Sequence, residues 1–192
     1  MSNSKVLNAI GVAVNIATLL IIFLFGELNF KRLKLNGPYQ VGFREFRTAQ
    51  LDNEVSVYYP ISKKEHEMHI NEPDRNTLWL RHGDKSLLGF AKAAGGYAYG
   101  GKGKHIPLPS VRPLKFIQTD ALSYGELAKD IEKLVPIIYC HGLSSNRSMH
   151  SGTAKDFASH GYIVFIMDHR DESCSYVESK DGRNQMYYNN DY

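Results

Sequence analysis

Two short apolar runs decide the fold: residues 135–140 read VPIIYC, and residues 162–167 read YIVFIM. Continuous apolar runs of this length are typical of strands that are buried on both faces of a sheet. His141-Gly142 breaks the first run and Asp168 ends the second. Because a helical pattern lies between the two runs, the sequence predicts a β-α-β unit with a right-handed crossover and parallel strands. The fold class is therefore predicted to be α/β.

The connecting segment, residues 146–160, predicts a helix. Ser145 or Asn146 can cap its first turn, and Gly161 can end it. Its apolar stripe, which is expected to face the sheet, comprises Met149, Thr153, Ala154, Phe157 and Ala158.

Upstream, residues 54–59 (EVSVYY) alternate in polarity and predict a half-buried strand that Pro60 ends. Residues 41–46 are its expected hairpin partner. Residues 120–134 predict a helix, since Leu127, Ile131 and Leu134 share one face at helical spacing.

Residues 6–25 carry no charge, and as a helix they would span about 30 Å, the thickness of a bilayer's hydrocarbon core. We therefore expect residues 1–30 to form a single-pass membrane anchor near the N-terminus. The alternative is a secretory signal peptide and a secreted protein. The run exceeds the usual apolar region of a signal peptide, and no small-x-small cleavage site follows it, which favours the anchor.

Composition excludes several classes of protein. Hydrophobic residues make up 43% and charged residues 22% of the 192 residues, as in an ordinary globular domain. The net charge of +3 is too small to favour a nucleic-acid partner. Cys140 and Cys174 form no Cys-x-x-Cys motif, and His66 and His69 are one residue too close for His-Glu-x-x-His. No metal or cofactor is expected.

Residues 91–119 hold five Lys or Arg and no acidic residue. This run either contacts a lipid headgroup surface or is simply a solvated face. The glycine cluster at residues 95–103 approaches the phosphate-loop spacing, but Gly103 replaces the required Ser or Thr. We interpret the cluster as a mobile loop rather than a nucleotide site.

The turn at His141-Gly142-Leu143 follows the C-terminal end of a buried parallel strand, where open α/β sheets place their sites. Backbone N–H groups in such a turn can stabilise an oxyanion, although a plain strand-to-helix turn has the same sequence. No Gly-x-Ser-x-Gly nucleophile elbow occurs in the chain. Ser144 and Ser145 are therefore interpreted as turn or capping residues.

Several short motifs, kept in order over residues 36–177, resemble the platelet-activating factor acetylhydrolase family (1-alkyl-2-acetylglycerophosphocholine esterases) of the α/β-hydrolase fold. That family reads His-Gly-Leu-Gly, then Leu-Ala-Ser-His-Gly-Phe-Ile-Val, then Glu-His-Arg-Asp-x-Ser. The matching segments here are HGLS (141–144), FASHGYIV (157–164), DHRDES (168–173), GPYQVG (37–42), VYYP (57–60) and NTLW (76–79).

The resemblance implies a metal-independent serine esterase of the phospholipase A2 type that cleaves short or oxidised sn-2 acyl chains of phospholipids. It assigns the Leu143 backbone N–H to the oxyanion hole, with His141 and Gly142 shaping the oxyanion loop. Ser144 departs from the family's Gly. The nucleophile and the acid and base of the triad would lie beyond Tyr192.

We therefore expect the N-terminal half of an α/β-hydrolase domain at residues 36–177, followed by a polar tail at residues 178–192 that marks a truncation point. The expected partners are phospholipid substrate and a membrane. The chain alone is expected to be inactive. The alternative hypothesis is a non-catalytic, membrane-anchored lipid-binding or structural subunit, which would need a partner protein if Tyr192 is the true C-terminus.

Overall fold

The computed structural model describes residues 5–6, 9–13, 16, 34–99 and 112–189. The apolar run at residues 6–25, expected to form a membrane anchor, lies largely outside these residues. Within the described part of the chain, no helix combines the length and hydrophobicity needed to cross a membrane.

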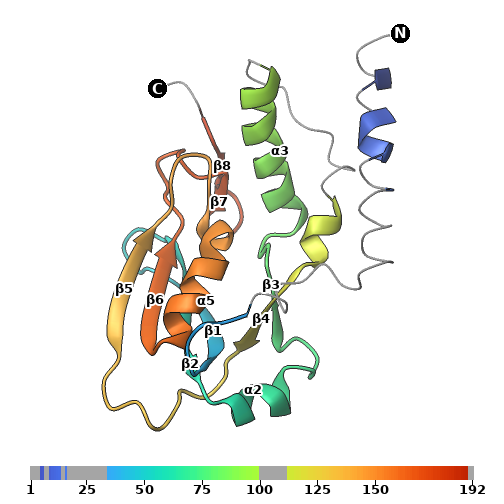
Figure 1. Ribbon diagram of the computed structural model, residues 1–192. Helices are drawn as coiled ribbons and strands as arrows, with labels where there is room; N and C mark the ends of the chain where they lie inside the picture. The colour runs from blue at the N-terminus through green and yellow to red at the C-terminus, as the bar shows by residue number, and fades with distance from the viewer. Residues whose placement is uncertain (1–4, 7–8, 14–15, 17–33, 100–111, 190–192) are drawn as a thin grey trace.

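A six-stranded mixed sheet forms the centre of the protein, in the order β3-β4-β1-β2-β6-β5 (Figure 1). A separate two-stranded sheet pairs β7 with β8. The strands are β1 (Gln40–Arg47), β2 (Glu54–Ile61), β3 (Asn76–Leu78), β4 (Gln118–Ser123), β5 (Val135–Cys140), β6 (Tyr162–Met167), β7 (Tyr176–Glu178) and β8 (Gln185–Tyr187). The helices are α2 (Lys63–His69), α3 (Asp84–Tyr99), α5 (Ser151–Ser159) and the 3₁₀ turns η2 (Arg112–Phe116) and η3 (Arg147–His150).

The predicted β-α-β unit is confirmed, but the expectation that β5 is buried on both faces was wrong, because Val135 and Ile138 are exposed. β5 and β6 pair in parallel from Val135 opposite Tyr162 to Cys140 opposite Met167, with η3 and α5 between them. Asn146 caps the first turn, because its side-chain oxygen accepts the N–H groups of Ser148 and Met149. The two C-terminal strand ends therefore lie together at one edge of the sheet.

The buried face of α5 differs from the predicted stripe. Ala154 and Ala158 are buried as expected, but Met149 and Phe157 are exposed. Lys155 is buried instead, and its ammonium group donates to the Thr119 carbonyl of β4. The helix lies so close to the sheet that small side chains and one hydrogen-bonded lysine fill the contact.

The predicted hairpin between β1 and β2 is also confirmed, with Val41 opposite Pro60. Two details were wrong, since β2 continues through Pro60 to Ile61 and is buried along its whole length. It lies between β1 and β6, and its side chains alternate between two apolar clusters. Tyr58 joins the cluster with α5, whereas Val55, Val57, Tyr59 and Ile61 join the cluster on the other face.

Two predictions for the middle of the chain were wrong. Residues 120–134 begin in β4 and continue as turns and loop rather than as a helix. Asp120 and Tyr124 have φ values of +59° and +57°, which a helix cannot accommodate. The first part of the glycine cluster is not a loop, because α3 extends to Tyr99; residues 100–103 lie outside the described residues.

The predicted polar tail contains the end of the β7–β8 hairpin, which packs on α3. A Cβ atom at Gly89 of α3 would lie 2.4 Å from the Ser175 carbonyl oxygen, so this close approach requires glycine. The ammonium group of Lys92 lies 3.6 Å from the centre of the Tyr187 ring. The hairpin thereby holds the segment that follows β6 against the rest of the protein.

Candidate functional site

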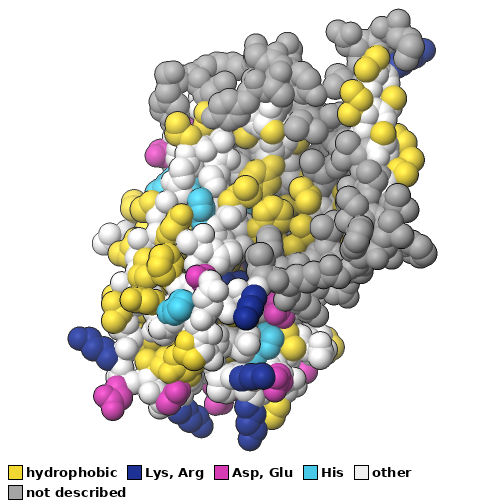
Figure 2. Space-filling model, viewed as in Figure 1, with side chains coloured by type: hydrophobic (Ala, Val, Ile, Leu, Met, Phe, Trp, Pro, Cys, Tyr) yellow, Lys and Arg dark blue, Asp and Glu magenta, His cyan; other side chains and the backbone are white. Residues whose placement is uncertain are grey.

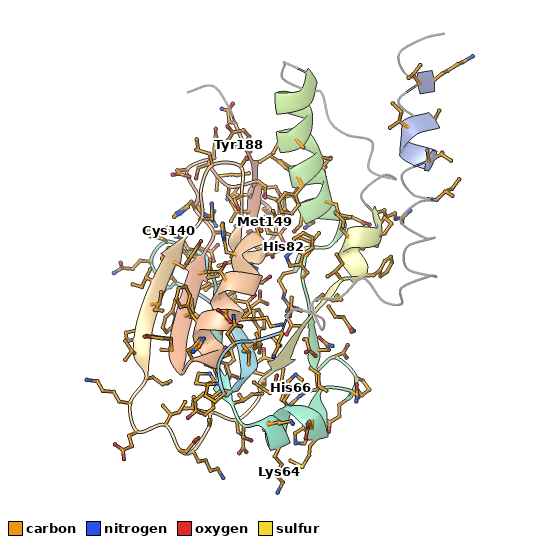
Figure 3. The ribbon with its side chains drawn as sticks, viewed as in Figure 1. Lys64, His66, His82, Cys140, Met149 and Tyr188 are labelled. Carbon is orange, nitrogen blue, oxygen red and sulfur yellow. The ribbon has the colours of Figure 1, made fainter. Side chains whose placement is uncertain are left out.

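The candidate site is the loop that follows β5, at residues 141–146. Cys140, labelled in Figure 3, marks the strand end from which the loop departs. His141 is buried, whereas Gly142 and Leu143 are exposed. The structure thus brings the three residues of the predicted oxyanion loop together at the C-terminal edge of the sheet, with one side chain directed inward.

A tight turn forms the tip of this loop. The Ser145 N–H donates to the Gly142 carbonyl at 3.2 Å, which closes a four-residue turn. Ser144, the third residue of the turn, has a φ of +58°, in the left-handed region that favours glycine. Ser144 therefore occupies a conformation that suits the family's Gly at this position and that is strained for serine.

The segment after β6 holds the loop in place. The Ser144 N–H donates to the Ser173 carbonyl and the Ser175 N–H donates to the Ser145 carbonyl, both at 2.8 Å. The Asn146 side-chain amide donates to Ser175 Oγ at 3.0 Å. Asn146 is also buried, so the N-x-S sequence that it begins does not present an accessible glycosylation site.

One backbone donor of the turn remains available. Among the residues that the structure describes, none accepts a hydrogen bond from the Leu143 N–H. Leu143 is 63% exposed, so this N–H lies in an accessible part of the loop. A rigid turn with an accessible N–H can bind an oxyanion or another acceptor.

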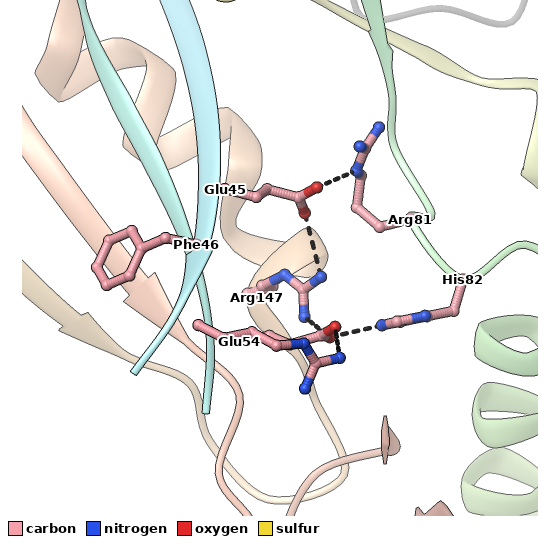
Figure 4. A pocket seen from close by; sticks show the side chains of 7 residues that line it. Glu45, Phe46, Glu54, Arg81, His82 and Arg147 are labelled. Atoms are coloured by element: carbon pink, nitrogen blue, oxygen red, sulfur yellow. Dashed lines mark hydrogen bonds and ion pairs between the residues drawn. The ribbon is translucent and has the colours of Figure 1, made fainter. Parts of the chain in front are cut away.

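A buried ion cluster centred on Arg147 supports the start of η3 (Figure 4). The Arg147 guanidinium contacts Glu54 at 2.5 Å, pairs with Asp168, and donates to Ser56 Oγ at 3.1 Å. The Arg147 backbone N–H also donates to Asp168 Oδ1 at 2.7 Å. The cluster therefore joins β2, the end of β6 and the residue that follows the loop.

Glu54 is the most heavily engaged carboxylate of the cluster. It also pairs with Arg47, and its Oε2 lies 2.5 Å from His82 Nε2. Burial alone would raise the pKa of the Glu54 carboxyl, but the His82 hydrogen bond and the Arg147 charge outweigh it and lower the pKa to about 2. Glu54 is thus an anion at all ordinary pH values.

An open hollow of about 270 Å³ lies beside this cluster. Charged groups make up most of its lining, and they pair with one another across it. They are Glu45, Arg47, Glu54, Arg81, His82 and Arg147, together with the ring of Phe46. Because the carboxylates and guanidinium groups neutralise each other, the cluster has the chemistry of a structural network rather than of a catalytic one. Sequence reasoning missed the cluster, since its members, with Asp168, come from five separate segments of the chain.

His141, Asp168 and Cys174 lie close enough to be considered as metal ligands, with one ligand atom of each within 4.8 Å of the others. Their hydrogen bonds argue against that role. The Cys174 thiol donates to the Tyr176 carbonyl, and burial beside Asp168 strongly raises its pKa, so it is a neutral thiol. Asp168 is already paired with Arg147. The donor set therefore does not fit a metal ion.

Ser145 and His150 form a contact that the sequence did not predict, with Ser145 Oγ 3.3 Å from His150 Nε2. Within the described part of the chain, no acidic side chain is in contact with His150, whose ring packs on Tyr139. The pair thus lacks the third group that orients the base in an activated serine. The interpretation of Ser145 as a turn residue stands, although Asn146 rather than Ser145 caps the helix.

Comparisons with known proteins agree with the motif pattern. Residues 26–190 match the family model described as "Platelet-activating factor acetylhydrolase, isoform II". The chain is 30% identical over 159 residues to the platelet-activating factor acetylhydrolase of Cavia porcellus, covering 81% of this chain and 32% of the relative. The corresponding protein of Bos taurus is 30% identical over 142 residues, covering 73% and 28%.

The chain therefore spans about a third of the length of the curated relatives that it matches. Among solved structures, a ferulic acid esterase from Streptomyces cinnamoneus matches with a TM-score of 0.46 and 15% identity, over 80% of this chain and 39% of that one.

Proposed function

Because the chain belongs to the platelet-activating factor acetylhydrolase, isoform II, family, we propose that it forms the N-terminal part of a serine esterase. The substrates would be phospholipids with short or oxidised sn-2 acyl groups. The serine nucleophile and its acid and base would lie in a region that corresponds to the part of the relatives that this chain does not span. Residues 36–177 would supply the oxyanion loop and the first half of the sheet.

The Leu143 N–H carries this proposal. Attack of a serine hydroxyl on the sn-2 carbonyl carbon places a negative charge on the carbonyl oxygen, while a base accepts the hydroxyl proton. The Leu143 N–H would donate to that oxygen. When the C=O bond re-forms, the ester C–O bond breaks and the protonated base gives its proton to the departing oxygen, so the lysophospholipid leaves as an alcohol. Water then hydrolyses the acyl-enzyme and releases the short fatty acid. The exposed, rigid turn supports this role, because a donor fixed in advance costs no reorganisation during the reaction.

A backbone substitution tests the role of this N–H. Replacing Leu143 by its α-hydroxy-acid analogue exchanges the N–H for an ester oxygen and keeps the side chain. In the protein as its gene encodes it, we expect kcat for a 2-acetyl phospholipid to fall about 10²- to 10³-fold. Leu143→Ala, which keeps the N–H and removes an exposed side chain, is the matched control and should retain kcat. An unchanged kcat in the backbone variant would contradict the assignment.

We further propose that residues 1–30 anchor the enzyme in the membrane where its substrate lies. The uncharged run at residues 6–25 supports this location. After alkaline carbonate extraction the protein should remain in the membrane pellet. Recovery from the medium with a processed N-terminus would instead establish secretion through a signal peptide.

The alternative proposal is a non-catalytic, membrane-anchored lipid-binding or structural subunit built on a partial hydrolase fold. Residues 1–192 alone should not hydrolyse the acetyl ester. If the protein as its gene encodes it also binds phospholipid vesicles without turnover, the second candidate replaces the first.

A further inference from the structure

We propose that His141 is a positioning residue that fixes the orientation of the Leu143 N–H, an inference that rests on the proposed function. Its two ring nitrogens have different partners. Nδ1 lies 2.9 Å from the Gly142 carbonyl oxygen, and Nε2 lies 3.2 Å from the His169 backbone nitrogen. The first contact reaches the loop and the second reaches the segment after β6.

These contacts define one tautomer. A carbonyl oxygen can only accept, so Nδ1 must carry the hydrogen that is donated to Gly142. A backbone N–H can only donate, so Nε2 must be the bare nitrogen that accepts from His169. Both requirements are met together only by the neutral imidazole with its hydrogen on Nδ1.

The surroundings of His141 also favour the neutral form. The side chain is buried, and burial lowers its pKa. His150 and His169 lie nearby and act in the same direction, whereas the Gly142 carbonyl and Asp168 oppose them. The net direction is downward, so the ring is neutral near pH 7.

Peptide geometry links this tautomer to the oxyanion donor. The Gly142 carbonyl and the Leu143 N–H belong to one peptide unit, and the described peptide bonds are all trans. In a trans peptide the C=O and N–H point in opposite directions. Because His141 Nδ1 and the Ser145 N–H both hold the carbonyl inward, the Leu143 N–H points away from them, on the exposed side of the turn.

The same geometry gives a role to the DHRDES segment, residues 168–173. His169 sets the tautomer of His141 through its backbone N–H, and Ser173 holds the Ser144 N–H through its carbonyl. Asp168 holds Arg147 directly after the loop. The segment is thus a scaffold for the oxyanion loop, although none of its side chains needs to touch substrate.

Two substitutions separate the two contacts. In His141→Asn the side-chain amide nitrogen takes approximately the place of Nδ1 and can still donate to Gly142. In His141→Gln the amide oxygen takes approximately the place of Nε2 and can still accept from His169, but the Gly142 carbonyl loses its side-chain donor and keeps only the Ser145 N–H. His160→Gln, at an exposed histidine at the end of α5, is the matched control.

The kinetic test uses the protein as its gene encodes it, with a 2-acetyl phospholipid as substrate. We expect His141→Gln to lower kcat about 10²-fold with an unchanged KM, since a misplaced donor affects the transition state rather than substrate binding. His141→Asn should stay within about fivefold of the wild type, and His160→Gln should match it. Equal losses of kcat in the Asn and Gln variants, or no loss in either, would overturn the positioning role.

A second measurement needs no turnover. The ¹⁵N shifts of the His141 ring in the wild type should show hydrogen on Nδ1 and a bare Nε2 at pH 7.5. The His169 amide should be protected from exchange in the wild type and in His141→Gln, but not in His141→Asn. A hydrogen on Nε2 would overturn the inference. If the wild type hydrolyses no ester, the proposed function fails, and the ring shifts still decide whether His141 fixes this peptide.

Discussion

β2 and β5 lie in the same sheet with β6 between them, and their burial is the opposite of what their side chains suggest. β2 includes Glu54 and Ser56, yet all eight of its residues are buried. β5 reads VPIIYC, yet Val135 and Ile138 are 49% and 71% exposed. Figure 2 shows hydrophobic side chains on the side of the molecule where β5 lies.

Position in the sheet explains the difference. β2 pairs with β1 and β6 and is covered on both faces, so its polar side chains must be neutralised inside the protein. Arg147 pairs with Glu54 and donates to Ser56, and Arg47 and His82 also contact Glu54. Within the described residues β5 pairs with β6 alone, and its apolar side chains therefore remain accessible. Alternating polarity identified β2 as a strand and a continuous apolar run identified β5, but these patterns assigned the greater burial to the wrong strand.

The largest expected effect on stability comes from removing the Arg147 guanidinium, which pairs with the buried polar residues of β2. Arg147→Met leaves Glu54 and Asp168 buried without their shared partner, and should reduce the free energy of unfolding by about 3–5 kcal/mol. Arg183→Met breaks an exposed pair with Asp181 and is the control, with a change below about 0.5 kcal/mol. Equal effects in urea unfolding would show that the cluster contributes no more than a surface pair.

Acid should weaken the same region of β2. The pKa of Glu54 falls from 4.5 to about 2 on folding, so its contribution is complete above pH 4.5 and is lost as the pH falls towards 2. The lost stability is about 3 kcal/mol. Urea unfolding between pH 5 and pH 2 should therefore show a steeper loss in the wild type than in Glu54→Gln. Parallel pH profiles would contradict the shift.

Matched valine truncations compare the two strands directly. Val57→Ala in β2 removes two methyl groups from a core residue that is 7% exposed, and should cost about 2 kcal/mol. Val135→Ala in β5 should cost less than about 0.5 kcal/mol, because that side chain is half exposed. Thermal or urea unfolding measures both. Similar costs would mean that β5 is covered in solution.

The smallest effect concerns the loop that β5 carries. Ser144→Gly removes the strain of a serine at a φ of +58°. Glycine also has greater entropy in the unfolded chain, which offsets part of this gain, so the free energy of unfolding should rise by about 0.5 kcal/mol. Ser145→Gly, the neighbouring position without a positive φ, should lower it. A loss of stability in Ser144→Gly would show that the serine side chain stabilises the turn.

Local patterns predicted the parts of the fold that depend on neighbouring residues. The β1–β2 hairpin, the β-α-β unit and the His141 loop were all identified from the chain. Residues 120–134 were assigned wrongly because their helical spacing competes with long-range pairing of β4, which the sequence does not reveal. α3 was missed for a related reason, since its buried side chains pack against elements distant in the chain.

For the candidate site too, the local turn was predictable from the sequence and its long-range supporting contacts were not. The motif His-Gly-Leu located the turn, and the family resemblance assigned the Leu143 N–H. The supports of the turn were not predictable, because they join residues far apart in the chain, as Arg147 and Glu54 do. Lys155 is a similar case. A charged lysine predicts an exposed position, but in the structure its ammonium group is buried and donates a hydrogen bond to a carbonyl of β4.

One measurement tests the central claim most directly: a structure of the protein as its gene encodes it, inhibited by a phosphonate with a short acyl-like chain. Such an adduct on the nucleophilic serine reproduces the tetrahedral geometry of the intermediate. The account predicts a phosphonyl oxygen 2.7–3.1 Å from the Leu143 nitrogen, with the Gly142 carbonyl still held by His141. An adduct whose oxygen is bound elsewhere, with the Leu143 N–H left without an acceptor, would contradict it.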